Sequence, residues 1–263
     1  MEREQLKITY LYNSGFVVET ENRMLIFDCC NAQVEGNDST LLTGTVSPKD
    51  FEGKEHITIF ASHGHKDHFY PLILRWGKKN NRIDYVLSDD IKVGKNAIHI
   101  RGNESIDVSG MSVTAFKSND AGVSYLVNLD GNVIFHAGDT NLWCKEPEKT
   151  DTDYIEAKYR YRLSKIAFQQ AVTPIMKRKI DIVFFPLDPH IGLGYENGAL
   201  YFLSRVKPKL FIPMHFGYLY DACTKFKKVN NIPDMTVWCI NRQGQQLIYD
   251  KNSGEAISIE NRW

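Results

Sequence analysis

A histidine-rich segment that follows a short apolar run constrains this chain more than any other feature. Residues 63–68 read His-Gly-His-Lys-Asp-His, and residues 57–60 just before them read Ile-Thr-Ile-Phe, which predicts a buried strand. His63 and His65 then share one side of an extended segment, because side chains alternate along a strand. The chain turns after them, so that Asp67 and His68 face a second position, separate from the one that His63 and His65 share. Imidazole nitrogens and carboxylate oxygens bind zinc and its first-row neighbours, so the segment predicts a metal-binding loop.

Two further candidate ligands follow other apolar runs. Asp139 lies in the stretch His-Ala-Gly-Asp-Thr at 136–140, and His215 follows the run 210–213, Leu-Phe-Ile-Pro, with one residue between them. A carboxylate such as that of Asp139 can bridge two cations and lower their mutual repulsion. Taken alone, an aspartate in this context is usually a turn residue or a helix cap, and a single histidine is usually structural. Their positions at the ends of apolar strands favour a functional role beside the histidine segment.

The remaining pattern predicts a single α/β domain over residues 1–263, rich in strands at first and alternating between helix and strand later. In the first half, Asp130-Gly131 between two apolar runs predicts a two-residue hairpin turn. In the second half, residues 153–172 and 197–206 are expected to be helical. Asp153 and the glutamate three residues after it resemble a capping box at the start of the first helix.

Charge and composition narrow the expected partners. The chain has 32 Lys and Arg against 32 Asp and Glu, so its formal net charge is zero and gives no global attraction to nucleic acid or to an anionic membrane. No apolar run approaches the ~18 residues of a membrane span, and the charged N terminus, residues 1–5, does not resemble a signal peptide. We therefore expect a small-molecule substrate, and neither a nucleic-acid nor a membrane partner.

The five cysteines are expected to be reduced. Cys29 and Cys30 are adjacent, a spacing that strains a disulfide, and no pair has the two-residue separation of a thiolate zinc site. A chain of this size does not need disulfides to fold. The set is typical of a cytoplasmic protein without a structural disulfide.

Together these residues resemble the metallo-β-lactamase superfamily. Residues 63–68 match its HxHxDH motif, Asp139 its bridging aspartate and His215 its final histidine. Asp28, at the end of the run Leu-Ile-Phe-Asp, matches its early aspartate. The resemblance implies an αββα sandwich, two mixed sheets flanked by helices, with metals at one sheet edge. The stretches 11–16 and 135–140 are most similar to the branch that contains ascorbate-6-phosphate lactonase.

The resemblance also implies an activity and a role for each residue. Members hydrolyse their substrates with a metal-bound hydroxide, here on a small-molecule ester, lactone, amide or phosphoester. It assigns one or two divalent ions, zinc first and manganese or iron as alternatives. The implied ligands are His63 and His65 for the first metal, Asp67, His68 and His215 for the second, and Asp139 for both. Asp67 is also expected to orient the hydroxide, and Asp28 to steady a ligand imidazole.

One departure from the family concerns the first metal. Members usually carry another histidine ahead of the strand that leads to the bridging aspartate, but residues 117–124 contain none. Asp120 is the strong metal-binding side chain in that stretch, and we expect it to replace the histidine and to shift the preference toward manganese or iron. The alternative is that Asp120 is an ordinary turn residue.

Other residues are weaker candidates. His190, just after the buried run 182–185, is a candidate catalytic residue that contacts the substrate, and the alternative is a plain loop. Asn13 interrupts an early strand and could reach the site, whereas His136 is expected to be a core histidine. Two other functions stay open, a metal-dependent nuclease or phosphodiesterase and a non-catalytic metal-binding protein with a degenerate site.

Overall fold

The computed structural model describes residues 5–30, 32, 40–230 and 234–259. The charged residues 1–4, on which part of the expectation about the N terminus rested, lie outside the described residues.

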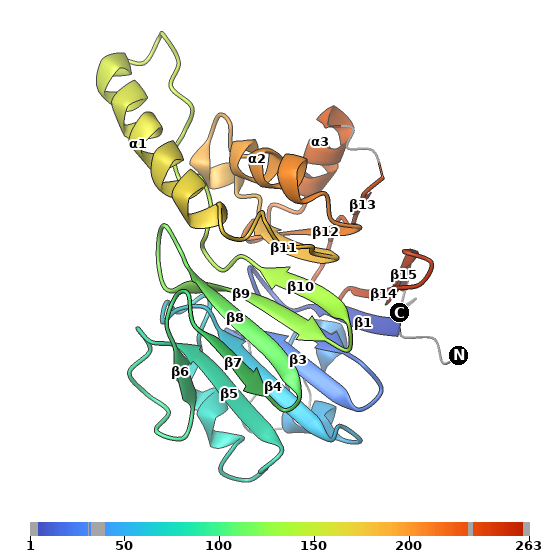
Figure 1. The fold of residues 1–263 in the computed structure, drawn as a ribbon. Coiled ribbons are helices and arrows are strands. Elements are labelled where there is room, and N and C mark those ends of the chain that lie inside the picture. Colours follow the sequence, from blue (N-terminus) through green and yellow to red (C-terminus); the bar gives the residue numbers. More distant parts are fainter. Residues whose placement is uncertain (1–4, 31, 33–39, 231–233, 260–263) are drawn as a thin grey trace.

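Two mixed β-sheets face each other (Figure 1). The first sheet has the strand order β15-β14-β1-β2-β3-β4-β5-β6, and the second has the order β13-β12-β11-β10-β9-β8-β7. The strands of the first sheet are β1 (Gln5–Tyr10), β2 (Phe16–Glu19), β3 (Arg23–Phe27), β4 (His56–Ala61), β5 (Ile83–Ser88), β6 (Ile98–Ile100), β14 (Gln246–Asp250) and β15 (Ala256–Ile259). Those of the second are β7 (Ser105–Val108), β8 (Met111–Lys117), β9 (Val123–Leu129), β10 (Asn132–His136), β11 (Ile182–Pro186), β12 (Leu210–Met214) and β13 (Thr236–Val237).

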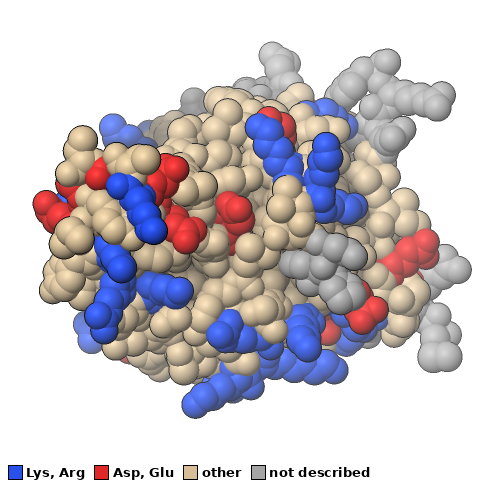
Figure 2. All heavy atoms as spheres, turned by 90° about the horizontal axis from the view of Figure 1, so that it is seen from above, with Lys and Arg blue, Asp and Glu red and all other residues tan. Residues whose placement is uncertain are grey.

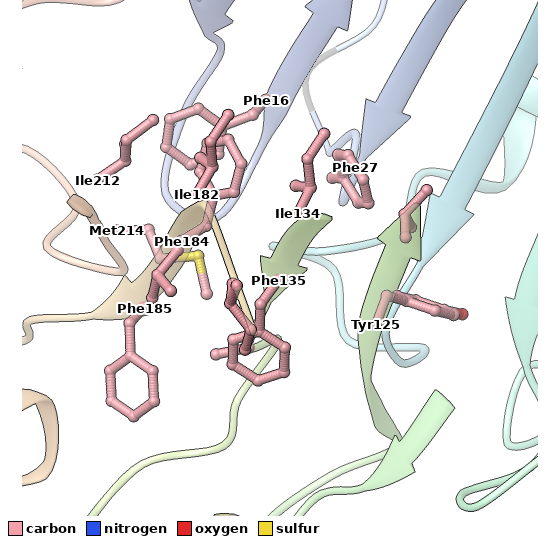
Figure 3. Packing of buried hydrophobic residues seen from close by; sticks show 14 of the residues in the cluster. Phe16, Phe27, Tyr125, Ile134, Phe135, Ile182, Phe184, Phe185, Ile212 and Met214 are labelled. Carbon is pink, nitrogen blue, oxygen red and sulfur yellow. The ribbon is translucent and has the colours of Figure 1, made fainter. Parts of the chain in front are cut away.

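Alternation along the strands divides the apolar side chains between two faces. In β3, Leu25 and Phe27 belong to the core between the sheets, whereas Met24 and Ile26 belong to a second cluster on the outer face. Figure 3 shows the main core, where the ring of Phe184 on the second sheet lies 4.6 Å from that of Phe16 on the first. Both faces of each sheet are therefore covered, which explains why the central strands read as continuous apolar runs.

The two outer faces are covered differently. Three α-helices cover the second sheet in Figure 1, and they are α1 (Tyr154–Val172), α2 (Asn197–Val206) and α3 (Asp221–Val229). The first sheet is covered by short 3-10 helices, η1 (Leu41–Thr43), η2 (Pro48–Phe51) and η3 (Pro71–Arg75), whose apolar residues join the outer cluster. A fourth, η4 (Pro189–Ile191), follows β11. The predicted fold of two mixed sheets flanked by helices is confirmed, with 3-10 turns in place of α-helices on one side of the described part.

Local predictions had mixed outcomes. Asp130 and Gly131, with φ angles of 48° and 79°, form the predicted hairpin turn between β9 and β10. The two predicted helices are present, but the capping box is wrong, because Asp153 makes no side-chain cap. Its carboxylate instead binds the guanidinium of Arg160 at 2.6 Å, which also binds Glu156 at 2.7 Å. Figure 2 shows acidic and basic side chains gathered together on the side of the molecule where α1 lies.

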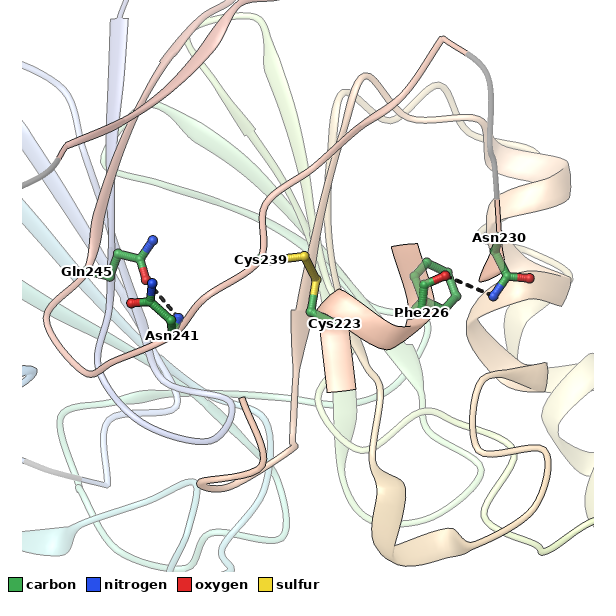
Figure 4. Close-up of a disulfide and its surroundings, with 6 residues drawn as sticks. All are labelled: Cys223, Phe226, Asn230, Cys239, Asn241 and Gln245. Atoms are coloured by element: carbon green, nitrogen blue, oxygen red, sulfur yellow. Dashed lines mark hydrogen bonds between the residues drawn. A yellow bond between two sulfur atoms is a disulfide. The ribbon is translucent and has the colours of Figure 1, made fainter. Parts of the chain in front are cut away.

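The prediction of five reduced cysteines is wrong for one pair. Cys223 and Cys239 form a disulfide (Figure 4). Cys223 lies on the buried face of α3, and Cys239 lies just beyond β13, so their Cα atoms are 5.3 Å apart, within bridging distance. The expectation of a cytoplasmic location loses the support that it drew from reduced thiols.

Within the described ranges, no helix is both long enough and apolar enough to cross a membrane.

We predict that the disulfide stabilises the fold. The two cysteines are 16 residues apart, and closing a loop of that size removes unfolded-state entropy worth about 3 kcal/mol. Reductant, or Cys223→Ser, should lower the melting temperature measured by circular dichroism by several degrees. Cys144→Ser is the control and should leave it unchanged, and an unchanged melting temperature in both variants would contradict the prediction.

Candidate metal centre

The candidate residues are carried by loops that begin at the carboxyl ends of strands. Parallel neighbours end at the same sheet edge, and β3 with β4, and β10 with β11 and β12, are such neighbours. Packing of the two sheets brings the two edges together. The residues are Asp28 after β3, His63 after β4, Asp139 after β10, Asp188 after β11 and His215 after β12.

The first potential metal-binding group consists of His63, His65 and Asp139. Nε2 of His63 lies 3.0 Å from Nδ1 of His65 and 3.2 Å from Oδ2 of Asp139. His63 is fully buried at the end of β4, whereas His65 is exposed on the loop. These are the residues that the sequence assigned to the first metal and to the bridge.

The second group consists of Asp67, His68 and His215, and Asp139 reaches it with its other oxygen. Nε2 of His68 lies 3.0 Å from Oδ1 of Asp139 and 3.4 Å from Oδ2 of Asp67. Nε2 of His215 lies 3.5 Å from Oδ1 of Asp139 and 3.8 Å from Oδ2 of Asp67. Asp139 therefore faces both groups, one carboxylate oxygen to each.

The spacing and the unmet hydrogen-bonding capacity of these atoms fit metal ions. Ligands at about 2.1 Å from a tetrahedral cation are about 3.4 Å apart, which is within the range of the separations above. Nε2 of His68 and Oδ1 of Asp139 are buried and have no hydrogen-bond partner among the described residues. Buried polar atoms that face one another without a hydrogen bond are costly unless a cation joins them.

The buried carboxylate of Asp28 orients the histidines of the loop. It accepts hydrogen bonds from the backbone N–H and the hydroxyl of Ser62, both at 2.7 Å, and from Nδ1 of His68 at 2.7 Å. Because the Ser62 hydroxyl donates to Asp28, it accepts from Nδ1 of His63 at 3.0 Å. Both imidazoles therefore turn Nε2 toward the groups described above.

Burial and charge compete at these side chains. Burial opposes a charge on His68, but the carboxylates of Asp28, Asp139 and Asp67 outweigh it and raise the pKa of His68 to about 12. The close approach of the His68 ring, with Nε2 at 3.4 Å from Oδ2 of Asp67, is the main reason that the pKa of Asp67 falls to about 2, although partial burial opposes this. Burial likewise opposes the ionised form of Asp139, yet contacts with His63 and His68 hold its pKa well below its usual range.

Asp188 supports His215, a role that the sequence analysis did not predict, because it considered the segment 188–190 only as a possible substrate contact, with His190 as the catalytic candidate. Oδ2 of Asp188 accepts from Nδ1 of His215 at 3.1 Å, which leaves Nε2 of His215 free for the second group. Oδ1 of Asp188 accepts from Nδ1 of His190 at 2.7 Å, and the His190 side chain is 69% exposed. The signal that could have indicated Asp188 is its position at a strand end, next to the strand that precedes His215.

Asn13 joins the site from the turn between β1 and β2. Its Nδ2 donates to Oδ2 of Asp67 at 3.0 Å, and its backbone carbonyl accepts from the N–H of His215 at 3.1 Å. Both Asn13 and His215 have positive φ angles, 52° and 62°, a strained conformation that is found at functional sites. The turn therefore holds the two outer ligands of the second group in place.

Asp120 lies apart from both groups. Gly122, at φ +57°, packs its backbone so tightly against the loop that an added Cβ would lie 2.0 Å from the carbonyl oxygen of Ser62. This contact carries the tip of the turn outward, where Asp120 is exposed and its N–H donates to the hydroxyl of Ser118. The structure thus places Asp120 as a turn residue, the alternative weighed in the sequence analysis.

His136 is a core residue, as expected. Its Nε2 lies 2.8 Å from the carbonyl oxygen of Ser14, and its ring stacks on that of Phe27 at 5.1 Å. Burial lowers its pKa, which keeps the ring neutral.

Comparisons with known proteins agree with this geometry. No protein-family model matches the chain. It is 24% identical over 230 residues to a UPF0173 metal-dependent hydrolase of Pelotomaculum thermopropionicum, a match that covers 81% of this chain and 85% of that protein. It is 22% identical over 269 residues to a UPF0173 metal-dependent hydrolase of Staphylococcus carnosus, covering 93% and 100% of the two chains.

A solved structure shows the same fold. The metallo-β-lactamase fold protein YhfI from Bacillus subtilis superposes with a TM-score of 0.58 at 13% identity, covering 94% of this chain and 100% of that one. The predicted metallo-β-lactamase fold is confirmed, and the predicted enzyme class agrees with the metal-dependent hydrolases named above.

We predict that the two groups bind metal unequally. The second group offers four donor residues with Asp139, whereas the first offers three. Zinc titrated into chelator-stripped protein should bind in two steps that differ at least about tenfold in affinity. His65→Ala should remove the weaker step and His215→Ala should weaken the tighter one. If His65→Ala instead removed the step with the higher affinity, the first group would be the tighter metal site and the prediction would be wrong.

We also predict that metal uptake releases a proton. A cation that binds Nε2 of His68 must displace the proton that a pKa of about 12 keeps on the ring. Because that raised pKa favours the protonated ring throughout the neutral range, apparent affinity should rise as pH rises, about tenfold per unit between pH 6 and 8. Calorimetry in buffers of different ionisation enthalpy measures the release. His99→Ala, which changes an exposed histidine, is the control, and a pH-independent affinity would refute the prediction.

Proposed function

We propose that this protein hydrolyses a small-molecule ester, lactone, amide or phosphoester, using divalent transition-metal ions held by the two groups. The observation that carries the proposal is the position of Asp139. Its Oδ2 lies 3.2 Å from Nε2 of His63 and its Oδ1 lies 3.0 Å from Nε2 of His68, so one carboxylate serves both groups. Such sharing holds two cations close together, as hydrolytic sites with paired metals require.

In this proposal, the cations activate water and substrate, and the aspartates around the site position the ligands and the water. Bound cations of this class lower the pKa of a water molecule and polarise a carbonyl or phosphoryl oxygen. Asp28 and Asp188 hold the imidazoles of His68 and His215 with Nε2 directed into the site. Asp67 is 46% exposed and ionised, so it can accept a hydrogen bond from a water molecule at the mouth of the site and orient it, while Asn13 fixes its position.

Aromatic side chains beside the second group support an organic substrate. The ring of Trp143 lies edge-on to that of His215 at 5.0 Å, and its Nε1 donates to the carbonyl oxygen of Asp139 at 2.6 Å. Tyr12, next to Asn13, lies 4.9 Å from the exposed ring of Tyr218. The similarity of residues 11–16 and 135–140 to the ascorbate-6-phosphate lactonase branch supports a lactone or ester among the substrate classes.

Donor chemistry favours zinc, with manganese or iron as alternatives. The groups combine four imidazoles with two carboxylates, a mixture that suits zinc and its first-row neighbours. The test is a turnover assay on chelator-treated protein with zinc, manganese or iron restored, on p-nitrophenyl acetate, γ-butyrolactone and bis-p-nitrophenyl phosphate. Metal-dependent turnover of one substrate supports the proposal, and metal uptake without turnover of any would favour a non-catalytic role.

We predict that His65→Ala and Asp67→Ala each lower kcat/KM by about 100-fold or more, at least about 2.7 kcal/mol of transition-state stabilisation. Both side chains lie on the loop after β4 rather than in the core, so circular dichroism should be unchanged. His99→Ala is the matched control on an exposed histidine. Full activity in either variant would remove that residue from its assigned role.

Two variants distinguish a residue that orients a metal ligand from one that contacts the substrate. Asp188→Asn tests the first role and His190→Ala tests the second. Removing the charge that orients His215 should weaken metal binding by about 10- to 100-fold. If His190 contacts the substrate, as the sequence suggested, His190→Ala should lower kcat/KM with metal content unchanged. Metal content by elemental analysis and steady-state kinetics measure the two effects, and unchanged kinetics in His190→Ala would exclude the catalytic role of His190.

A further inference from the structure

A cavity of about 480 Å³ lies at the opposite end of the first sheet from the metal centre. Its lining residues come from the segments that lead into β4 and β5, whereas the histidine loop follows the carboxyl end of β4. β4 and β5 are parallel, so the cavity lies at their amino ends. The six residues of β4 span about 20 Å. The cavity and the metal ligands lie at opposite ends of this strand and are therefore separated by about its length.

The apolar side of the cavity consists of two buried aromatic rings. Phe51 and Trp76 meet edge to face with centroids 5.2 Å apart, and Trp76 is 4% exposed. The hydroxyl of Tyr85 accepts from the N–H of Gly77 at 2.9 Å and donates to the carbonyl of Ile73 at 2.7 Å, which braces the segment that carries Trp76. The indole Nε1 is a buried donor with no acceptor in the described part of the chain.

The rim of the cavity is strongly cationic. Arg75, Lys78, Lys79 and Arg82 line it, and Glu52 is the acidic lining residue among those that the structure describes. Because the chain as a whole has zero net charge, this concentration is local. Arg82 is fixed by hydrogen bonds to the carbonyl of Lys54 at 2.5 Å and to Oδ1 of Asn80 at 3.2 Å.

The two lysines of the rim are available for a ligand. Both Lys78 and Lys79 are exposed, and their ammonium groups form no ion pair with the residues that the structure describes. The two neighbouring ammonium groups repel each other, and an anion between them relieves this repulsion. An aromatic floor beside such a rim offers contact to a flat apolar group.

We propose that this cavity is a second binding site, separate from the metal centre, for a small organic anion that carries a carboxylate or phosphate on a flat apolar or aromatic group. Its volume falls within the range of small-ligand pockets. The anionic part contacts the rim formed by the lysines and arginines, and the apolar part contacts the small portions of Phe51 and Trp76 that reach the cavity.

The test measures binding to metal-stripped protein by calorimetry, so that the metal centre does not compete. The probes are naphthalene-2-carboxylate and phenylphosphonate, each compared with its neutral counterpart, 2-naphthylmethanol and benzyl alcohol. The variant Lys78→Ala/Lys79→Ala removes half of the cationic rim. The matched control is Lys227→Ala/Lys228→Ala, an adjacent pair of exposed lysines on α3. Melting temperatures of both variants verify that they fold.

At least one anionic probe should bind about tenfold or more tightly than its neutral counterpart. The rim variant should weaken that binding about tenfold, the control should leave it unchanged, and salt at about 0.5 M should weaken it. Preference for the carboxylate or for the phosphonate identifies the anion, and either preference supports the proposal. Equal binding of anionic and neutral probes, or equal loss in both lysine variants, overturns it.

Discussion

The buried carboxylate of Asp28 holds the metal-binding loop in its working geometry. It accepts three hydrogen bonds from the loop after β4, and through Ser62 it also sets the orientation of His63. A carboxylate without access to water is costly unless it is paired, and here burial is offset mainly by the charged ring of His68, which keeps the pKa of Asp28 low. Asp28 therefore couples the end of β3 to the ligands that follow β4, and the loop has one favourable arrangement rather than several.

The same balance extends across the site, where charges of opposite sign are buried side by side. Oδ1 of Asp139 and Nε2 of His68 lie 3.0 Å apart, yet neither atom forms a hydrogen bond with another described residue. Buried ion pairs of this kind contribute little net stability to a fold. At the junction of the two sheets, such a pair therefore contributes more to ligand binding than to stability.

The fold was predictable from the sequence, and so was the grouping of most candidate ligand residues, because both depend on local pattern. Residues 63–68 carry most of the candidate ligands within a single loop. Asp130-Gly131 specifies its hairpin through the backbone conformations that these two residues prefer. Asp188 was not predictable, because its role depends on β11 and β12 being neighbours in the sheet. The pairing of Cys223 with Cys239 likewise depends on where α3 packs. Asp120 has the right chemistry for a ligand, but the contact of Gly122 with the histidine loop directs it outward.

The ligands come from both sheets, since His63 to His68 extend from the first and Asp139 and His215 from the second. A bound cation would thus link the two sheets to each other, because its ligands come from both. Any species that binds only the native chain stabilises it by mass action, about 2.7 kcal/mol at 100 times its dissociation constant. The resistance of this protein to unfolding would then vary with the free metal concentration of its surroundings, so that scarcity of metal would loosen this edge of the sandwich before it affected the apolar core between the sheets.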